Sequence, residues 1–371
     1  NPKDKRYKHL IGQKVILPIV NREIPIFADS YVDMEFGTGA VKVTPAHDPN
    51  DFDMGQRNDL EIINIMNQDA SLNNNVPEPF RGLTTKKARR LVVEQMDSKG
   101  FLEKVEDYVH KVGHSERTDA VVEPYISKQW FLDMEKLVEP AIDCVKNGEV
   151  RFHPERWTKT YYHWLENIKD WCISRQLWWG HRIPVWYKND EIYCGIEPPE
   201  GEGWIQDEDV LDTWFSSWLW PFATLGWPED NEDLKKHYPT QDLVTGPDII
   251  FFWVARMIMA GLYFKKQVPF SDVYFTGLVR DNLGRKMSKS LGNSPDPVDL
   301  MNKYGTDALR VGILLIAPQG LDILFSEDKI EHGRNFMNKV WNSARFVNMN
   351  LDSSVKPDIS DLNNQELNKT D

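Results

Sequence analysis

The first part of the chain has short apolar runs separated by turn-forming residues. Apolar residues cluster at 15–20, 24–28 and 40–43, and Gly, Pro, Asn and Asp stand between these runs. Short runs with this punctuation predict strands joined by turns, and the pattern at 84–99 predicts a helix. We therefore expect residues 1–112 to form a compact, mainly β module with a few helices.

The remainder of the chain has longer segments with helical periodicity. Helices are predicted at 134–147, in the apolar stretch that begins at Thr245, and after Pro297, and residues 304–310 predict a turn into another helix. A further helix containing Ser174 and Arg175 is predicted to end at Gly180. The run 273–279 predicts a strand. From Ser326 onward, apolar residues recur on one face of a predicted amphipathic helix: Ile330, Phe336, Val340, Trp341, Ala344, Phe346 and Val347. Strands and helices in this arrangement predict an α/β fold followed by helices.

Composition narrows the class of protein. A chain of 371 residues with 41% hydrophobic residues has room for two or three domains with a large core. A net charge of −13 provides no general attraction for nucleic acid, so any contact with RNA must depend on local basic patches. Three widely spaced cysteines predict neither a disulfide framework nor a zinc site, and we expect a reducing cytoplasm. We see no secretory signal and no apolar run of membrane-spanning length, and therefore expect no membrane association.

The loop between the predicted strand at 273–279 and the helix after Pro297 is rich in cations and hydroxyls. It contains Lys286-Met287-Ser288-Lys289-Ser290, which follows Gly284 and precedes Gly292. Lysines can follow a phosphate whose charge grows during a reaction, serines add neutral donors, and glycines let the loop bend. Most clusters of this kind are solvated turns, but ligands of parallel α/β folds bind at such junctions between a strand and a helix. The spacing excludes a Walker loop.

The sequence KMSKS followed by LGN resembles the second ATP-binding signature of class I aminoacyl-tRNA synthetases. The resemblance implies an ATP site formed by Gly277 and by five residues of the signature: Lys286, Met287, Ser288, Lys289 and Ser290. It assigns the catalytic role to Lys286 and Lys289, with ATP and its Mg²⁺ as cofactors. We expect no metal site built by the protein itself.

The segment GTGAVKVTPAHDPNDF at 37–52 presents Asp48 and Asp51 around a Pro-Asn turn. The two aspartates could face a polar pocket that holds an ammonium group and orients a water, or they could cap a helix that begins near Phe52. Spacing alone favours capping. The segment also resembles the editing pocket of valyl-tRNA synthetases. That resemblance implies that Lys42, Thr44, Asp48 and Asp51 line a site that hydrolyses mischarged threonyl-tRNA. Asp51 would hold the amino group, and Asp48 and Lys42 would recognise the additional hydroxyl.

Further motifs point to an amino-acid pocket. SRQLWWGHRIP at 174–184 resembles the valyl and isoleucyl branch of the class I enzymes, and DTWFSS at 212–217 resembles the valyl enzymes. From the residues alone, tryptophan pairs and apolar helices are more often core than ligand pocket. The resemblance implies that Trp179, Ile249 and Trp253 shape an aliphatic pocket and that Asp248 fixes the adjacent helix end. Ile249 and Trp253 are four residues apart and share one helix face.

These motifs occur in order over nearly the whole chain, and together they resemble an internal part of a valyl-tRNA synthetase. The resemblance implies a partial editing domain at 1–112, the second half of a Rossmann-like catalytic domain at 113–310, and the start of an all-α anticodon-binding bundle at 311–371. Its partners would be valine, ATP and tRNA(Val), and we expect a cytoplasmic monomer. Because the first ATP signature would lie upstream, we expect these residues to be inactive alone. An isoleucyl-tRNA synthetase and a non-catalytic tRNA-binding paralogue remain as alternatives.

Overall fold

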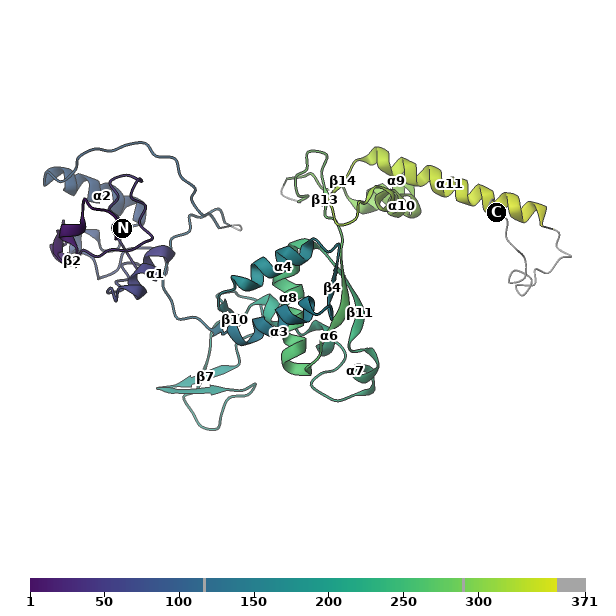
Figure 1. Ribbon diagram of the computed structural model, residues 1–371, viewed down its shortest axis with the longest axis horizontal. Coiled ribbons are helices and arrows are strands. Elements are labelled where there is room, and N and C mark those ends of the chain that lie inside the picture. Colours follow the sequence, from purple (N-terminus) through teal and green to yellow (C-terminus); the bar gives the residue numbers. More distant parts are fainter. Residues whose placement is uncertain (116–117, 289–290, 352–371) are drawn as a thin grey trace. The chain divides into compact units, whose positions relative to one another are not determined.

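A computed structural model describes residues 1–115, 118–288 and 291–351, and its contacts divide the chain into units at 1–128 and 129–371. The first unit contains the antiparallel strands β1 (Lys14–Leu17) and β2 (Arg22–Pro25) and the helices α1 (Pro49–Arg57) and α2 (Thr85–Ser98) (Figure 1). It also has short 3₁₀ turns, η1 (Lys8–Leu10) and η2 (Glu78–Phe80). Its small core consists of Met66, Leu72, Phe80 and Ala88.

The predicted mainly β character of the first unit is wrong for the described residues. The runs at 15–20 and 24–28 contribute the β1–β2 hairpin, whereas residues 40–43 form no strand. Gly37 and Gly39 before this run have positive φ angles of 56° and 75°, and the N–H of Thr44 after it donates to the carboxylate of Asp51. Because a side chain takes this donor, it cannot contribute to a strand ladder. The predicted helix at 84–99 is confirmed as α2.

The second unit is built around a parallel sheet with the strand order β11 (Thr240–Thr245), β12 (Phe270–Phe275), β4 (Arg151–His153). Helices α3 (Glu135–Lys146) and α4 (Trp157–Glu166) pack beside the sheet together with the helical segment 247–265 (Figure 1). That segment joins β11 to β12 and consists of four consecutive helical pieces: the 3₁₀ helix η3 (Pro247–Ile249), the π-helix η4 (Ile250–Val254), the α-helix α8 (Ala255–Ala260) and the π-helix η5 (Gly261–Lys265). A helix that connects two parallel strands in this way is the basic α/β unit.

The segment 247–265 corrects one expectation from the sequence. By length and composition, with a mean hydropathy of 1.4, it could cross a membrane, although we expected no apolar run of that length. In the fold, all residues of α8 are buried, and all except Arg256 belong to the apolar core around the sheet. A helix that is apolar on nearly all sides is expected when the helix lies inside a domain.

Short antiparallel strands surround this core. β3 (Phe131–Leu132) pairs with β5 (Trp171–Cys172), and β6 (Ser174–Arg175) pairs with β10 (Val210–Leu211). A separate sheet has the order β8 (Glu191–Cys194), β7 (Val185–Lys188), β9 (Ile205–Gln206). Three short helices follow: α5 (Thr213–Ser217), α6 (Trp220–Ala223) and α7 (Glu232–His237).

The predicted helix through Ser174 and Arg175 is wrong, because both residues lie in β6. Strand pairing with β10 uses their backbone groups, and the hydroxyl of Ser174 accepts from the N–H of Trp130 and donates to Gln129. Contacts with residues distant in sequence therefore override the local periodicity here.

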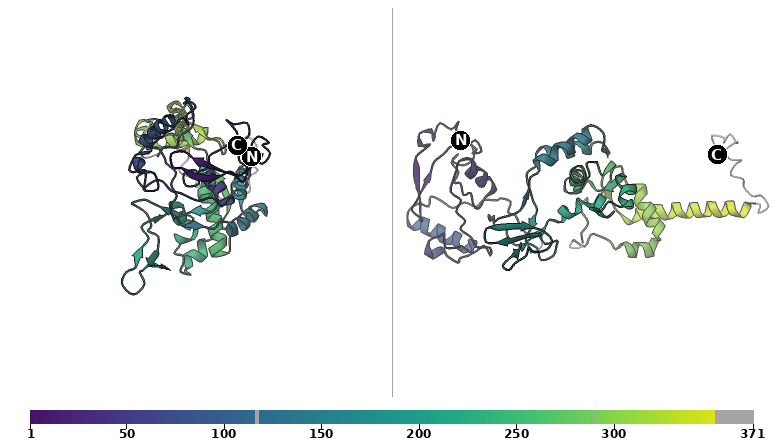
Figure 2. Two further views of the ribbon diagram at one scale, coloured as in Figure 1. Left: turned by 90° about the vertical axis from the view of Figure 1, so that its left-hand side faces the viewer. Right: turned by 90° about the horizontal axis from the view of Figure 1, so that it is seen from below.

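The C-terminal part of the second unit pairs β13 (Val279–Arg280) in parallel with β14 (Ile323–Leu324). Three helices follow the sequence predictions: α9 (Pro297–Tyr304), α10 (Thr306–Ile316) and α11 (Glu327–Asn350), the last of which Figure 2 shows as one continuous helix. Leu300, Ala308, Leu309, Phe325 and Ile330 form a separate core between them. Residues 352–371 lie outside the described residues.

Candidate functional site

The signature segment begins at the carboxyl end of the parallel sheet. Strands β11 and β12 end in register at Thr245 and Phe275, and the N–H of Thr276 donates to the Thr245 carbonyl at 2.9 Å. Beyond these ends, a Cβ at Gly246 would lie 3.6 Å from Leu278. The start of the helical segment 247–265 and the start of the signature segment are therefore neighbours, at the edge of the sheet where parallel α/β folds bind ligands.

Gly277 has a packing role at this edge. A Cβ on this residue would lie 1.7 Å from the carbonyl oxygen of Leu321, so only glycine fits this close approach. Next to it, the N–H of Leu278 donates to Asp322 at 3.1 Å, and the Arg280 guanidinium forms an ion pair with the same carboxylate. The contact with Arg280, more than any other, lowers the pKa of Asp322. The structure thus fixes the base of the loop through the segment at 320–324.

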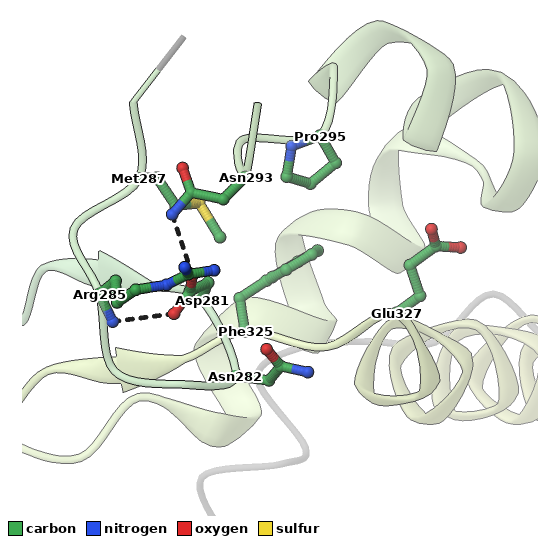
Figure 3. A pocket seen from close by; sticks show the side chains of 8 residues that line it. All are labelled: Asp281, Asn282, Arg285, Met287, Asn293, Pro295, Phe325 and Glu327. Atoms are coloured by element: carbon green, nitrogen blue, oxygen red, sulfur yellow. Dashed lines mark hydrogen bonds and ion pairs between the residues drawn. The ribbon is translucent and has the colours of Figure 1, made fainter. Parts of the chain in front are cut away.

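Asp281 organises the turn that leads into the signature. Its carboxylate is only 8% exposed and accepts the backbone N–H groups of Leu283 (3.0 Å) and Arg285 (2.8 Å), the Arg285 Nε (2.8 Å) and the Asn293 amide (2.9 Å). These donors, first the Asn293 amide, hold the pKa of Asp281 at about 2, below its ordinary value of 3.8. Figure 3 shows Arg285 and Asn293 converging on this carboxylate from two parts of the loop. Sequence reasoning did not select Asp281.

The signature residues are attached to the rest of the domain in different ways. Asn293 accepts the N–H of Ser288 at 2.9 Å and donates to the carbonyl of Lys286 at 3.3 Å, whereas the residue Lys286 is exposed. The side chain of Met287 packs against the core formed by α9, α10, α11 and Phe325. The structure therefore gives Met287 an anchoring position. The predicted Lys289 and Ser290 lie outside the described residues.

An open hollow of about 240 Å³ lies beside this loop, between the turn and α11 (Figure 3). Its lining residues are Asp281, Asn282, Arg285, Met287, Asn293, Pro295, Phe325 and Glu327.

The residues predicted to form an amino-acid pocket are only partly brought together. Ile249 and Trp253 lie on the segment 247–265, and Trp253 Nε1 donates to the carbonyl of Ser217 in α5 at 2.9 Å. Asp248 stands in the first turn of η3, whose N-cap is Gly246. Trp179, in contrast, is 90% exposed, so this structure does not enclose it in a pocket.

The glycine after Trp179 has a clear packing reason. A Cβ at Gly180 would lie 2.8 Å from a side-chain carbon of Val210 in β10, so a larger residue would have to push these segments apart. The Trp-Gly pair thus combines an exposed ring with a backbone that packs closely on the core.

A cluster of charged side chains around Asp212 and Arg256 was not predicted from the sequence. Asp212 caps α5 by accepting the N–H of Trp214 (3.0 Å), and it also accepts Trp171 Nε1 (2.9 Å) and Arg175 Nη2 (2.6 Å). The guanidinium carbon of Arg256 lies 3.5 Å from the centroid of the Trp171 ring. Burial lowers the pKa of Arg256 to about 10. In the sequence, the feature that could have indicated this cluster is Arg256, a single arginine within the apolar run of α8.

In the first unit, the four predicted editing residues are connected by hydrogen bonds. The Asp51 carboxylate accepts the N–H of Thr44 at 2.7 Å, and the Lys42 ammonium donates to the Thr44 hydroxyl. Asp48 is the N-cap of α1 and accepts the N–H groups of Asn50 and Asp51. The capping interpretation is therefore correct for Asp48, whereas Asp51 folds back onto the segment that precedes the helix.

The described residues contain no group of three or more His, Cys, Asp or Glu side chains that could hold a metal ion. A carboxylate close to the signature, Asp281, is already surrounded by four donors. The carboxylate of Asp281 is therefore engaged by these donors in the described structure and is not directed at a metal ion.

Comparison with known proteins identifies the family. The model for class I tRNA synthetases (I, L, M and V) matches residues 33–204 and 198–326, so the chain belongs to the class I tRNA synthetases and has their α/β catalytic fold.

Within this class, the chain is similar to proteins named valine–tRNA ligase. It is 56% identical to the one from Chlorobaculum tepidum over 94% of this chain, and 54% identical to the one from Clostridium tetani over 100% of this chain. It spans only 40% and 43%, respectively, of the length of these relatives. A methionyl-tRNA synthetase structure from Mycobacterium tuberculosis in complex with methionyl-adenylate has a TM-score of 0.48 and 19% identity, covering 76% of this chain and 53% of that chain. The assignment rests on the sequence comparisons.

Proposed function

We propose that the protein is a valine–tRNA ligase that activates valine with ATP, transfers it to tRNA(Val), and hydrolyses mischarged threonyl-tRNA. The observation that carries the proposal is the 54–57% identity to valine–tRNA ligases across 94–100% of this chain. The position of the signature loop at the carboxyl edge of a parallel sheet supports it. The domain limits at residues 112 and 310 and the monomeric, cytoplasmic state belong to the same proposal.

In activation, the valine carboxylate attacks the α-phosphate of ATP and pyrophosphate leaves. Lys286, and Lys289 with it, would stabilise the charge that develops on the departing phosphates, because a lysine is a compact and mobile cation. Magnesium, when bound with ATP, neutralises phosphate charge. Gly277 would let the backbone come close to the nucleotide, while Ser288 and Ser290 would add donors.

Specificity for valine would come from Ile249, Trp253 and Trp179. An apolar pocket distinguishes one methylene by only about 1–3 kcal/mol and rejects an isosteric hydroxyl weakly, which explains why a second hydrolytic site would be needed. Because Trp179 is 90% exposed, it would have to be covered when valine binds. Asp248, in the first turn of its helical segment, would hold the end of that segment at the pocket.

The editing site would use Lys42, Thr44 and Asp51, whose side chains and backbone already contact one another. Asp51 would hold the ammonium group of the misplaced residue, and Lys42 would recognise its hydroxyl. Asp48, at the N-cap of α1, would recognise that hydroxyl together with Lys42.

The activity is tested with the full-length protein that carries this sequence. We expect valine-dependent exchange of pyrophosphate into ATP, and charging of tRNA(Val). Exchange that depends on isoleucine would indicate the isoleucyl enzyme, and tRNA binding without exchange would indicate a non-catalytic paralogue.

The editing role is tested by two substitutions at one position. Asp51→Asn keeps an oxygen that can accept the N–H of Thr44, whereas Asp51→Ala removes it. If Asp51 holds an ammonium group, both variants lose hydrolysis of threonyl-tRNA(Val), by about tenfold or more. If the role is structural, Asp51→Asn retains hydrolysis and only Asp51→Ala is impaired.

A further inference from the structure

We propose that Asp281 and Asn293 are a positioning pair that holds the main chain of Lys286 and Ser288 in the shape required for phosphate binding. The inference rests on the proposed function and assigns residues that support the reaction without contacting the reacting atoms. It is carried by the hydrogen-bond geometry of the loop.

The polarity of the pair follows from the chemistry of Asp281. An ionised carboxylate can only accept hydrogen bonds, so the Asn293 amide must present its NH₂ group to it, at 2.9 Å. This leaves the Asn293 Oδ1 on the other side, where it accepts the N–H of Ser288 at 2.9 Å. The charge on Asp281 thereby selects the orientation of Asn293, and Asn293 in turn selects the backbone conformation at Ser288.

The same carboxylate fixes the turn before the signature. It accepts the N–H groups of Leu283 and Arg285 and the side chain of Arg285, and the turn is closed by the N–H of Gly284, which donates to the Asp281 carbonyl at 2.9 Å. One buried group thus connects the two ends of the segment 281–293. The residues between these ends include Lys286, which is exposed and able to reach a ligand.

This arrangement has a kinetic consequence. Lys286 would act where charge develops on phosphate. Its correct placement would therefore mainly stabilise the transition state of activation, and not the bound substrates. Loosening the backbone at 286–288 should therefore lower kcat and leave the KM for valine nearly unchanged, because valine would bind elsewhere.

A reciprocal exchange of the two residues tests the pair in the full-length protein. Asp281→Asn places two NH₂ groups face to face, and Asn293→Asp places two carboxylates face to face. The double variant Asp281→Asn/Asn293→Asp restores the contact with reversed polarity. In that variant the amide introduced at position 281 donates to the carboxylate introduced at position 293, whose second oxygen still accepts the N–H of Ser288. The donation from position 293 to the Lys286 carbonyl is not restored, so we expect partial recovery.

We expect each single variant to lower kcat of valine-dependent exchange roughly tenfold, with the KM for valine within about twofold. The kcat of the double variant should be about fivefold higher than the value expected if the two single effects simply multiplied. Asn302→Ala, on the exposed side of α9, is the matched control and should retain wild-type kinetics. The proposal would be overturned if the two single effects on kcat combined independently in the double variant, or if the variants changed only the KM for valine.

Amide hydrogen exchange provides a readout independent of catalysis. Asp281→Ala should accelerate exchange at Leu283, Arg285 and Ser288, whereas Asn293→Ala should accelerate it at Ser288 but not at Leu283. Unchanged exchange at Ser288 in Asp281→Ala would refute the pair even in an active enzyme. A wild-type protein with no valine-dependent exchange would refute the proposed function, while the amide pattern would still decide whether the pair holds the loop.

Discussion

At the level of single residues, buried charge is concentrated around Asp212 and Arg256. Asp212 has three donors, so its charge is satisfied. Arg256 is 5% exposed, and its Nε and Nη1 have no hydrogen-bond partner among the described residues. The contact with the Trp171 ring and the field of Asp212 compensate for part of the lost hydration. Packing of its long side chain is therefore a main contribution of Arg256 to stability.

We expect Arg256→Met to change the unfolding free energy by no more than about 1 kcal/mol, because it keeps much of the volume and removes a poorly satisfied charge. Arg256→Ala should cost about 2–4 kcal/mol, because it leaves a cavity beneath Trp171. Urea unfolding of the chain followed by tryptophan fluorescence measures both. Lys146→Met, on the exposed side of α3, controls for the loss of a cation. A loss in Arg256→Met as large as the loss in Arg256→Ala would show that the charge itself, and not only the volume, is required.

A second prediction at the level of single residues is that Asp281 makes the unfolding free energy depend on pH in the acid range. Its folded pKa of about 2 lies below the ordinary 3.8, so its contribution to stability is complete above about pH 4 and is lost as pH falls toward 2. The difference in unfolding free energy between the wild type and Asp281→Asn should be constant from about pH 5 to about pH 7 and should narrow below about pH 4. Urea titrations at several pH values measure it. A difference that does not depend on pH would contradict the assigned pKa.

At the level of elements, glycines determine how closely segments approach. Gly277 packs against the backbone of Leu321. Between α10 and α11, a Cβ at Gly333 would lie 2.3 Å from the carbonyl oxygen of Ala308 and 2.5 Å from the nitrogen of Gly312. These contacts let the backbones pack directly, so the signature loop is attached to a closely packed helical base.

Gly277→Ala should destabilise the chain by more than about 3 kcal/mol, because the added Cβ collides with backbone that cannot rotate away. Gly284→Ala is the matched comparison: it has a φ of +77° but no atom within 4 Å of its Cβ, so only the backbone strain of about 1–2 kcal/mol applies. Thermal unfolding of both variants gives the comparison. Equal losses would show that the approach of Leu321 is not a fixed feature.

At the level of the whole molecule, the chain divides into two units, with the boundary along the chain between Lys128 and Gln129. The residues before this boundary include an exposed segment, 103–113, with no helix or strand. Its Val109 is 97% exposed. Backbone without ladder or helix hydrogen bonds is the usual site of proteolytic cleavage.

Limited trypsin digestion should therefore cleave first at Lys104 or Lys111, in the exposed part of the first unit that precedes its boundary with the second. Mass spectrometry of early time points identifies the cleavage sites. Lys104→Ala/Lys111→Ala should slow this first cleavage, whereas Lys86→Ala, on α2, should not. First cleavage within α2 or α11 would contradict the accessibility of the segment 103–113.

Local patterns determined much of the secondary structure. The helices α2, α3, α9, α10 and α11 follow from periodicity and from start signals such as Asp296 before Pro297, because helix formation depends on neighbours three and four residues away. The signature at 286–290 and the likeness to the class I synthetases were also readable from the sequence, since they depend on residue identity and order.

Tertiary contacts decided the rest. Ser174 and Arg175 became a strand through pairing with β10. Residues 40–43 form no strand, and Asp51 takes the N–H of Thr44 that follows them. The pairing of Asp281 with Asn293 and the stacking of Arg256 on Trp171 join residues that are far apart along the chain. Sequence periodicity carries no information on such contacts, because they depend on how distant segments fold onto one another.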